Sequence, residues 1–111
     1  MNEAESFHRQ AMELAEEAAS LQARGDTTEA KRLYAAALEK ERRAAEYLDT
    51  RYEIEPTRSV LFRSAASLAI DCGDTRAAEK LIARGLAGDP PQEIATRVAD
   101  LCLELAAPLR K

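Results

Sequence analysis

The first candidate for chemistry is the single histidine of the chain, His8. His8 follows Glu5 by three positions, which is the Glu-x-x-His spacing that places two metal ligands on one helix face in helical di-iron proteins. Those sites need two copies of the motif, and this chain holds one histidine. Only a second copy of the chain would complete the ligand set. We therefore expect no metal or cofactor, and we interpret the segment as a solvated N-terminal turn.

Two cysteines are the other candidates. Cys72 and Cys102 do not form a Cys-x-x-Cys pair, and neither has a histidine partner in a recognisable pattern. Free cysteines are among the most buried residue types, and disulfides are rare outside oxidising compartments. We expect two thiols that pack in the core. Because there is also no glycine-rich phosphate loop, the sequence predicts a protein that is not an enzyme.

The charges and the apolar runs restrict the partners. The chain has 111 residues and a formal net charge of −4, which argues against nucleic-acid binding because that requires a basic face. The N-terminus lacks the features of a secretory signal, and no apolar run approaches the ~20 residues that span a bilayer. We therefore expect a cytoplasmic protein with no nucleic-acid or membrane partner.

The elements that must position these residues are predicted to be helices. The length suits one domain, the apolar content is rich in alanine, and the β-branched residues typical of strands are scarce. Apolar residues recur at steps of three and four, and glycine or proline interrupts the pattern. The sequence thus predicts an all-α fold of five helices in antiparallel hairpins, at residues 3–24, 27–54, 57–72, 75–88 and 90–106. The second helix is unusually long, so the first hairpin should be elongated.

One turn occurs twice. The segments that start at residues 24 and 72 both contain Gly-Asp-Thr and agree at a constant offset of 48. Gly25 and Gly73 accept the left-handed conformation that closes a helix. Asp26 and Asp74 then suit the N-cap of the next helix. An internal repeat of this kind indicates a repeat architecture.

The repeated residues resemble the tetratricopeptide repeat (TPR) family, whose unit is two antiparallel helices over about 34 residues. Residues 11–44 and 59–92 form the two units. The apolar and small positions of the family fall on Leu14, Ala18, Leu21, Ala30 and Tyr34 in the first unit, and on Phe62, Ala66, Ala69, Ala78, Ile82 and the closing Pro90 in the second. The resemblance implies a short superhelix with a C-terminal capping helix.

The chain also departs from the family. Glu17 replaces an apolar residue, and Arg42 stands where the closing proline of the first unit belongs. The spacing between units exceeds the family period by 14 (48 − 34), which is close to four helical turns. Two alternatives stay open: another alanine-rich helical bundle, and a resemblance of the N-terminal half to microtubule-interacting and trafficking (MIT) domains, against which the second Gly-Asp-Thr unit argues.

The resemblance implies a site as well as a fold. Repeats of this family hold a peptide or a helix of a partner protein in a groove lined by the first helix of each unit. Carried over to this sequence, that groove consists of Met12, Ala15, Ala19 and Gln22, then Val60, Arg63, Ser67 and Ile70, and finally Ile94 and Arg97. We expect an apolar peptide or helix, with an arginine pairing an acidic side chain.

A structural role is the second hypothesis. Short repeat arrays are marginally stable because each unit buries only part of its apolar face. The elongated part of the first hairpin would then form a homodimer. The residues expected at that surface are Ala44, Ala45, Leu48 and Tyr52.

Overall fold

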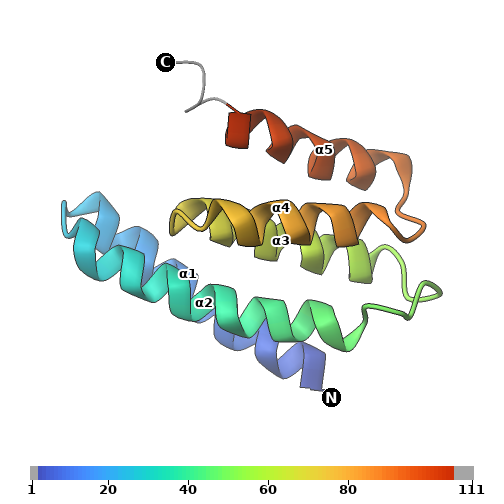
Figure 1. Ribbon diagram of the computed structural model, residues 1–111. Helices are drawn as coiled ribbons and strands as arrows, with labels where there is room; N and C mark the ends of the chain where they lie inside the picture. The colour runs from blue at the N-terminus through green and yellow to red at the C-terminus, as the bar shows by residue number, and fades with distance from the viewer. Residues whose placement is uncertain (1–2, 107–111) are drawn as a thin grey trace.

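The computed structural model describes residues 3–106, and within this range the chain forms five α-helices and no strand (Figure 1). The all-α prediction is confirmed, and so is the elongated first hairpin, since its helices have 21 residues each against 15 and 12 in the second hairpin. The helices are α1 (Glu3–Ala23), α2 (Thr27–Tyr47), α3 (Thr57–Asp71), α4 (Thr75–Leu86) and α5 (Gln92–Ala106).

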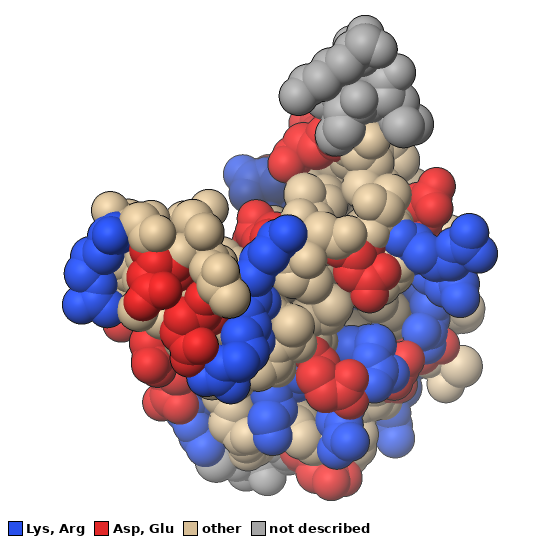
Figure 2. Space-filling view, turned by 60° about the vertical axis from the view of Figure 1, so that its left-hand side comes forward, with Lys and Arg blue, Asp and Glu red and all other residues tan. Residues whose placement is uncertain are grey.

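The helices stack in the order of the chain. α1 pairs with α2 and α3 pairs with α4, while α2 packs against α3 and α5 packs on both α4 and α3. α1 and α3 lie behind α2 and α4 in Figure 1. The α1–α2 turn extends beyond the α3–α4 turn, and it projects at the left of the space-filling view in Figure 2. In that view acidic and basic side chains are interspersed.

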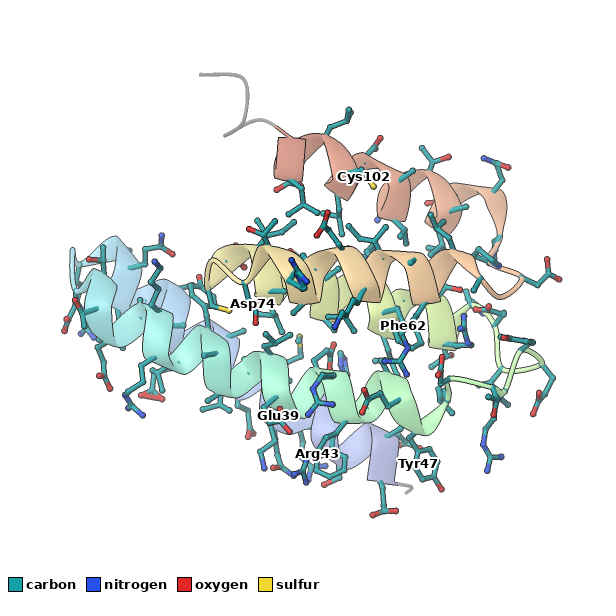
Figure 3. All side chains as sticks on the ribbon, in the orientation of Figure 1. Glu39, Arg43, Tyr47, Phe62, Asp74 and Cys102 are labelled. Atoms are coloured by element: carbon teal, nitrogen blue, oxygen red, sulfur yellow. The ribbon has the colours of Figure 1, made fainter. Side chains whose placement is uncertain are left out.

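The two Gly-Asp-Thr turns share one hydrogen-bond pattern. Gly25 and Gly73 have φ of 85° and 83°, in the left-handed region. Their N–H groups donate to the carbonyl three residues back at 3.0 Å, and the following aspartate N–H donates five residues back at 2.9 and 2.8 Å. This is the Schellman arrangement for closing a helix. The caps differ: Asp74 accepts from Ala77 N–H at 3.1 Å (Figure 3), whereas the Asp26 side chain makes no cap bond.

Three predicted helix boundaries are wrong by two residues or more, one of them at α4, which ends at Leu86 instead of residue 88. α2 ends at Tyr47 instead of residue 54, because residues 48–54 form successive tight turns, such as Arg51 N–H to Leu48 carbonyl at 2.9 Å. α5 begins at Gln92 instead of residue 90. Asp89, the residue before the predicted start, donates its backbone N–H to the Glu55 carboxylate at 3.3 Å. Both connections are fixed by tertiary contacts that helical periodicity does not encode.

The core is centred on α3. Phe62 is fully buried, and Ala65, Ala66 and Ala69 are 0% exposed where neighbouring helices approach α3. Gly85 of α4 allows the closest approach, since a Cβ there would lie 3.1 Å from Phe62 Cβ. Small residues at such crossings bring helix axes close, and Phe62 fills the space beside them. α3 is therefore buried on several sides.

The surface predicted for a homodimer is largely inside the protein. Ala44 and Ala45 are 0% exposed and Leu48 is buried with them, while Tyr52 is about half exposed. The reason is that α1 and α3 both pack on α2 and together cover its apolar residues. That prediction is therefore wrong for Ala44, Ala45 and Leu48.

Candidate functional site

A large cleft lies where α1, the end of α2 and the start of α3 meet. It has a volume of about 490 Å³, which is within the ~300–1,000 Å³ typical of ligand sites. We call it the wide cleft. Its lining comes from α1, from the end of α2 and the following loop, and from α3, as Ala4, Glu5 and His8, then Tyr47, Leu48, Arg51 and Ile54, then Thr57 and Leu61.

A smaller cleft lies at the other end of the first three helices, between the C-terminal ends of α1 and α3. It holds about 90 Å³, and we call it the narrow cleft. Gln22 of α1 and Asp71 of α3 border it, with Thr27, Ala30, Lys31 and Tyr34 of α2 between them. We use the name α1–α3 groove for these two clefts together with the face of α1 that runs between them.

His8 is held by a buried carboxylate. Its Nδ1 lies 2.9 Å from both Glu41 Oε1 and Glu41 Oε2, and Glu41 is 0% exposed while the His8 side chain is 42% exposed. The neighbouring Phe7 ring packs under Lys40 and Arg43, each with its cation 5.7 Å from the ring centroid. The expectation of a solvated N-terminal turn is wrong, because His8 links α1 to α2 through Glu41 and also lines the wide cleft.

The loop of residues 48–56, which closes the wide cleft, is anchored by Arg58. This arginine is 0% exposed and donates through Nε to the Asp49 carbonyl and through Nη2 to the Arg84 carbonyl, each at 2.7 Å. Its guanidinium lies between the Tyr52 and Phe62 rings, 4.8 and 4.9 Å from their centroids. A planar, permanently charged fork satisfies these acceptors in a way that lysine cannot.

Further bonds fix both ends of the same loop. Glu55 Oε1 accepts from Ser59 N–H at 3.0 Å and from Ser59 Oγ–H at 2.6 Å, so it caps the N-terminus of α3. Arg84 of α4 pairs with Glu46 at 3.1 Å and with Asp49 at 2.7 Å. The loop is therefore a preformed wall of the wide cleft.

The wide cleft offers several kinds of contact at once. Arg51 lies over the Tyr47 ring at 5.6 Å, and both are exposed. Glu5 and His8 face them across the cleft, and Leu61 contributes apolar surface. Such a lining suits a chain segment with an apolar residue and a polar or charged neighbour.

The narrow cleft holds titratable groups with shifted pKa values. Burial, followed by the negative charge of Glu104, raises the pKa of the Asp71 carboxyl. Burial, followed by the charge of Asp71, raises the pKa of the Tyr34 hydroxyl. Lys31 stands nearby, with its Nζ 3.7 Å from where a Cβ on Gly73 would lie. This end of the groove is polar.

The predicted α1 residues follow one helix face from the wide cleft. Met12, Ala15, Ala19 and Gln22 lie 4, 7, 11 and 14 positions after His8, the spacing of a single helical stripe. Gln22 lines the narrow cleft, so this stripe joins the two clefts. Met12, Ala19 and Gln22 are exposed and Ala15 is half-buried.

α3 presents a different face from the predicted one. Thr57, Leu61 and Asp71 line the clefts, whereas the predicted Val60, Arg63, Ser67 and Ile70 are half-buried on the adjoining face. A shift of one residue turns a helix face by about 100°. On α5, Ile94 is half-buried, and Arg97 is exposed and pairs with Glu93 at 3.3 Å.

Sequence reasoning missed most of the wide cleft. Arg51 and Ile54 were assigned to a helix, and no periodic signal distinguishes a buried Arg58 or Glu41 from a solvated one. The available signal was Pro56, because a proline disfavours helix at the residue before it and so indicates a loop in this region. Of the cysteines, Cys72 is half-buried but Cys102 is exposed, so the expectation of two buried thiols is wrong for Cys102.

No family model matches the sequence, no curated protein matches it, and no solved structure matches the fold. Within residues 3–106, no helix is both long enough and apolar enough to cross a membrane. In the same range, no three His, Cys, Asp or Glu side chains gather as a metal site.

Proposed function

We propose that this chain is a non-catalytic protein–protein interaction module of TPR-like type, which holds a peptide or helical segment of a cytoplasmic partner protein in the α1–α3 groove. The observation that carries the proposal is the pair of clefts that α1 and α3 border at opposite ends. A stripe of exposed and half-buried residues on α1 connects two clefts, and the larger has the volume of a ligand site.

The lining indicates what the partner segment carries. An apolar side chain fits between Leu61 and Ile54, and an acidic side chain next to it pairs with Arg51. A residue further along meets the small side chains of Ala15 and Ala19, which leave room above α1. Because the loop wall is already fixed by Arg58, little ordering of the protein opposes binding.

Peptide display tests this proposal. A library of random 14-residue peptides is selected on the wild-type protein, and enriched peptides are labelled and titrated by fluorescence anisotropy. The double variant Arg51→Glu, Ile54→Asp should raise Kd at least about tenfold, or ~1.4 kcal/mol, because both side chains border the wide cleft. Both are exposed, so the fold should persist, and circular dichroism checks that it does.

The matched control is Val60→Asp, Arg63→Glu on the adjoining face of α3. It introduces the same kinds of side chain, and we expect Kd to change less than about threefold. Equal effects of the two double variants would remove the α1–α3 groove from consideration. A library that yields no enriched peptide would contradict the proposal as a whole.

A further inference from the structure

Another cleft, nearly as large as the wide cleft, lies at the far end of the stack, between α4 and α5. It has a volume of about 470 Å³, and we call it the α4–α5 cleft. Its lining is mainly apolar and consists of Thr75, Glu79, Ile82, Ala83, Leu86, Cys102 and Leu105. Glu79 is the one charged side chain in that lining. None of these residues belongs to the α1–α3 groove.

α5 has an apolar face that its own packing does not bury. Ile94, Val98 and Leu101 face the core, and a neighbouring strip of small and apolar residues continues around the helix toward the cleft. Ala99, Cys102 and Leu103 on this strip are exposed, and Leu103 is the most exposed large apolar side chain described, at 62%. Leu86 of α4 is 40% exposed across the cleft. The charged residues of α5 occupy the opposite side, at Glu93, Arg97, Asp100 and Glu104.

The fold shows what covers such a face. α1 is covered by the antiparallel α2, and α3 by the antiparallel α4 (Figure 1). α4 has small residues at its crossing with α3, Ala78 and Gly85, and large ones beside them, Leu81 and Ile82. α5 stands where a third hairpin would begin, and no helix within residues 3–106 covers its outer side. In a stack that continued in the same way, the next helix would pack against α4 and α5, where the α4–α5 cleft lies.

We propose that the α4–α5 cleft binds an amphipathic, basic α-helix of another protein, which lies antiparallel to α5 and completes a third hairpin. The lining runs from Thr75 to Leu86, about 16 Å at 1.5 Å per residue, so about three turns of the partner helix are covered. Its apolar stripe packs on Ile82, Leu86 and Cys102, and a lysine or arginine pairs with Glu79.

Charge favours a different protein over a second copy of this chain. The helix that a second copy has available is α5, which carries three acidic residues and one basic residue. Its carboxylates lie on the side opposite the apolar strip, and its one basic residue, Arg97, pairs with Glu93, so a second copy would leave Glu79 without a cationic partner.

The test uses a probe with the expected chemistry. Residues 74–88 contain α4, the helix that covers α3, and they have an apolar face beside Arg76, Lys80 and Arg84. We take this sequence as a fluorescent peptide, with Ala83→Lys joined to Glu79 by a lactam because isolated helices this short are marginal in water. The protein carries Cys72→Ser, so that Cys102 (Figure 3) is its only thiol.

We expect the peptide to bind with saturable anisotropy and to slow the reaction of Cys102 with Ellman's reagent at least fivefold. Leu86→Asp in the protein should raise Kd at least tenfold. Glu79→Lys should raise it severalfold, and a peptide with Lys80→Glu and Arg84→Glu should bind the Glu79→Lys protein better than the wild type. The Leu81→Asp peptide is the control and should not bind.

Three results would overturn the proposal. One is no binding below 1 mM, and another is binding that leaves the Cys102 reaction rate unchanged, which would place the peptide elsewhere. The third is concentration-dependent self-association that protects Cys102 without peptide, which would make a second copy the occupant. The Arg51→Glu, Ile54→Asp variant should bind this peptide normally, so failure here and failure of the α1–α3 groove are distinguishable.

Discussion

At the scale of residues, the protein contains two buried charges with different surroundings. Glu41 has His8 as its partner, and Arg58 has backbone carbonyls, carboxylates and two aromatic rings. Burying a charge is unfavourable unless it is paired and hydrogen-bonded, and both groups satisfy that condition. Arg63, on the same helix as Arg58, does not fully do so: its Nε is buried with no hydrogen-bond partner among the described residues.

The two arginines of α3 should therefore respond in opposite ways to the same substitution. Arg58→Met strands the carbonyls of Asp49 and Arg84, and we expect a loss of about 3 kcal/mol in the free energy of unfolding. Arg63→Met removes an unpaired buried N–H and should be neutral or slightly stabilising. Urea titration of both variants measures this. Similar losses from the two would show that the Arg58 bonds contribute nothing beyond side-chain packing.

Asp71 should make stability depend on pH. Burial and then Glu104 raise its pKa in the folded protein, and its place at the C-terminal end of α3 also disfavours the carboxylate. Ionised Asp71 therefore destabilises the folded state at pH values above its folded pKa. This destabilisation disappears as the pH falls through the usual carboxyl range. We expect Asp71→Asn to raise the melting temperature at pH 7, with a gain that shrinks toward zero near pH 3.

Thermal unfolding at pH 7, 5 and 3 checks this expectation. The control is Asp100→Asn, because Asp100 lies in the middle of α5, away from either helix end. A gain from Asp71→Asn that is the same at all three pH values would contradict the assignment to its ionisation.

At the scale of elements, identical turn sequences have the same backbone bonds but different caps. The Schellman bonds depend on a glycine at positive φ, and both copies have one. The cap bond depends on the aspartate rotamer, and only Asp74 makes it. A sequence motif thus determines the backbone of the turn more firmly than the side-chain bond.

Because only one of the two aspartates makes a cap bond, replacing each of them by alanine should lower stability by different amounts. Asp74→Ala should lower stability by about 1 kcal/mol, the usual contribution of an N-cap, and Asp26→Ala by only a few tenths. Chemical denaturation measures both losses in the free energy of unfolding, provided that the variants and the wild type have the same m value. Equal losses would mean that Asp26 caps α2 in solution.

At the scale of the whole molecule, one polar network joins the two hairpins. Glu46 and Asp49 from the first hairpin and its loop meet Arg58 and Arg84 from the second. Gly88, after α4, leaves room for this network, because a Cβ there would lie 2.5 Å from Arg58 Nη1. The hairpins are therefore coupled through their side chains as well as through their apolar core.

Gly88→Ala tests that coupling. In the wild type the added methyl group displaces a buried guanidinium, and we expect a loss of about 1–3 kcal/mol. In an Arg58→Ala background the same change should cost less than about 0.5 kcal/mol, since the clash is gone. A double-mutant cycle by urea titration gives the difference. Additive losses would show that Gly88 acts through the backbone instead of through Arg58.

The sequence by itself determined the helical class, the five elements and the duplicated turn, because helix periodicity, glycine conformation and proline geometry are local properties. The α1 side of the groove stays a prediction, because Met12, Ala15 and Ala19 came from the TPR resemblance and line neither cleft. The end of α2, the face that α3 presents, the anchored loop and the exposure of Cys102 were decided only by the tertiary structure. They depend on which helix lies opposite, and a one-residue difference in α3 turns its contact face by about 100°.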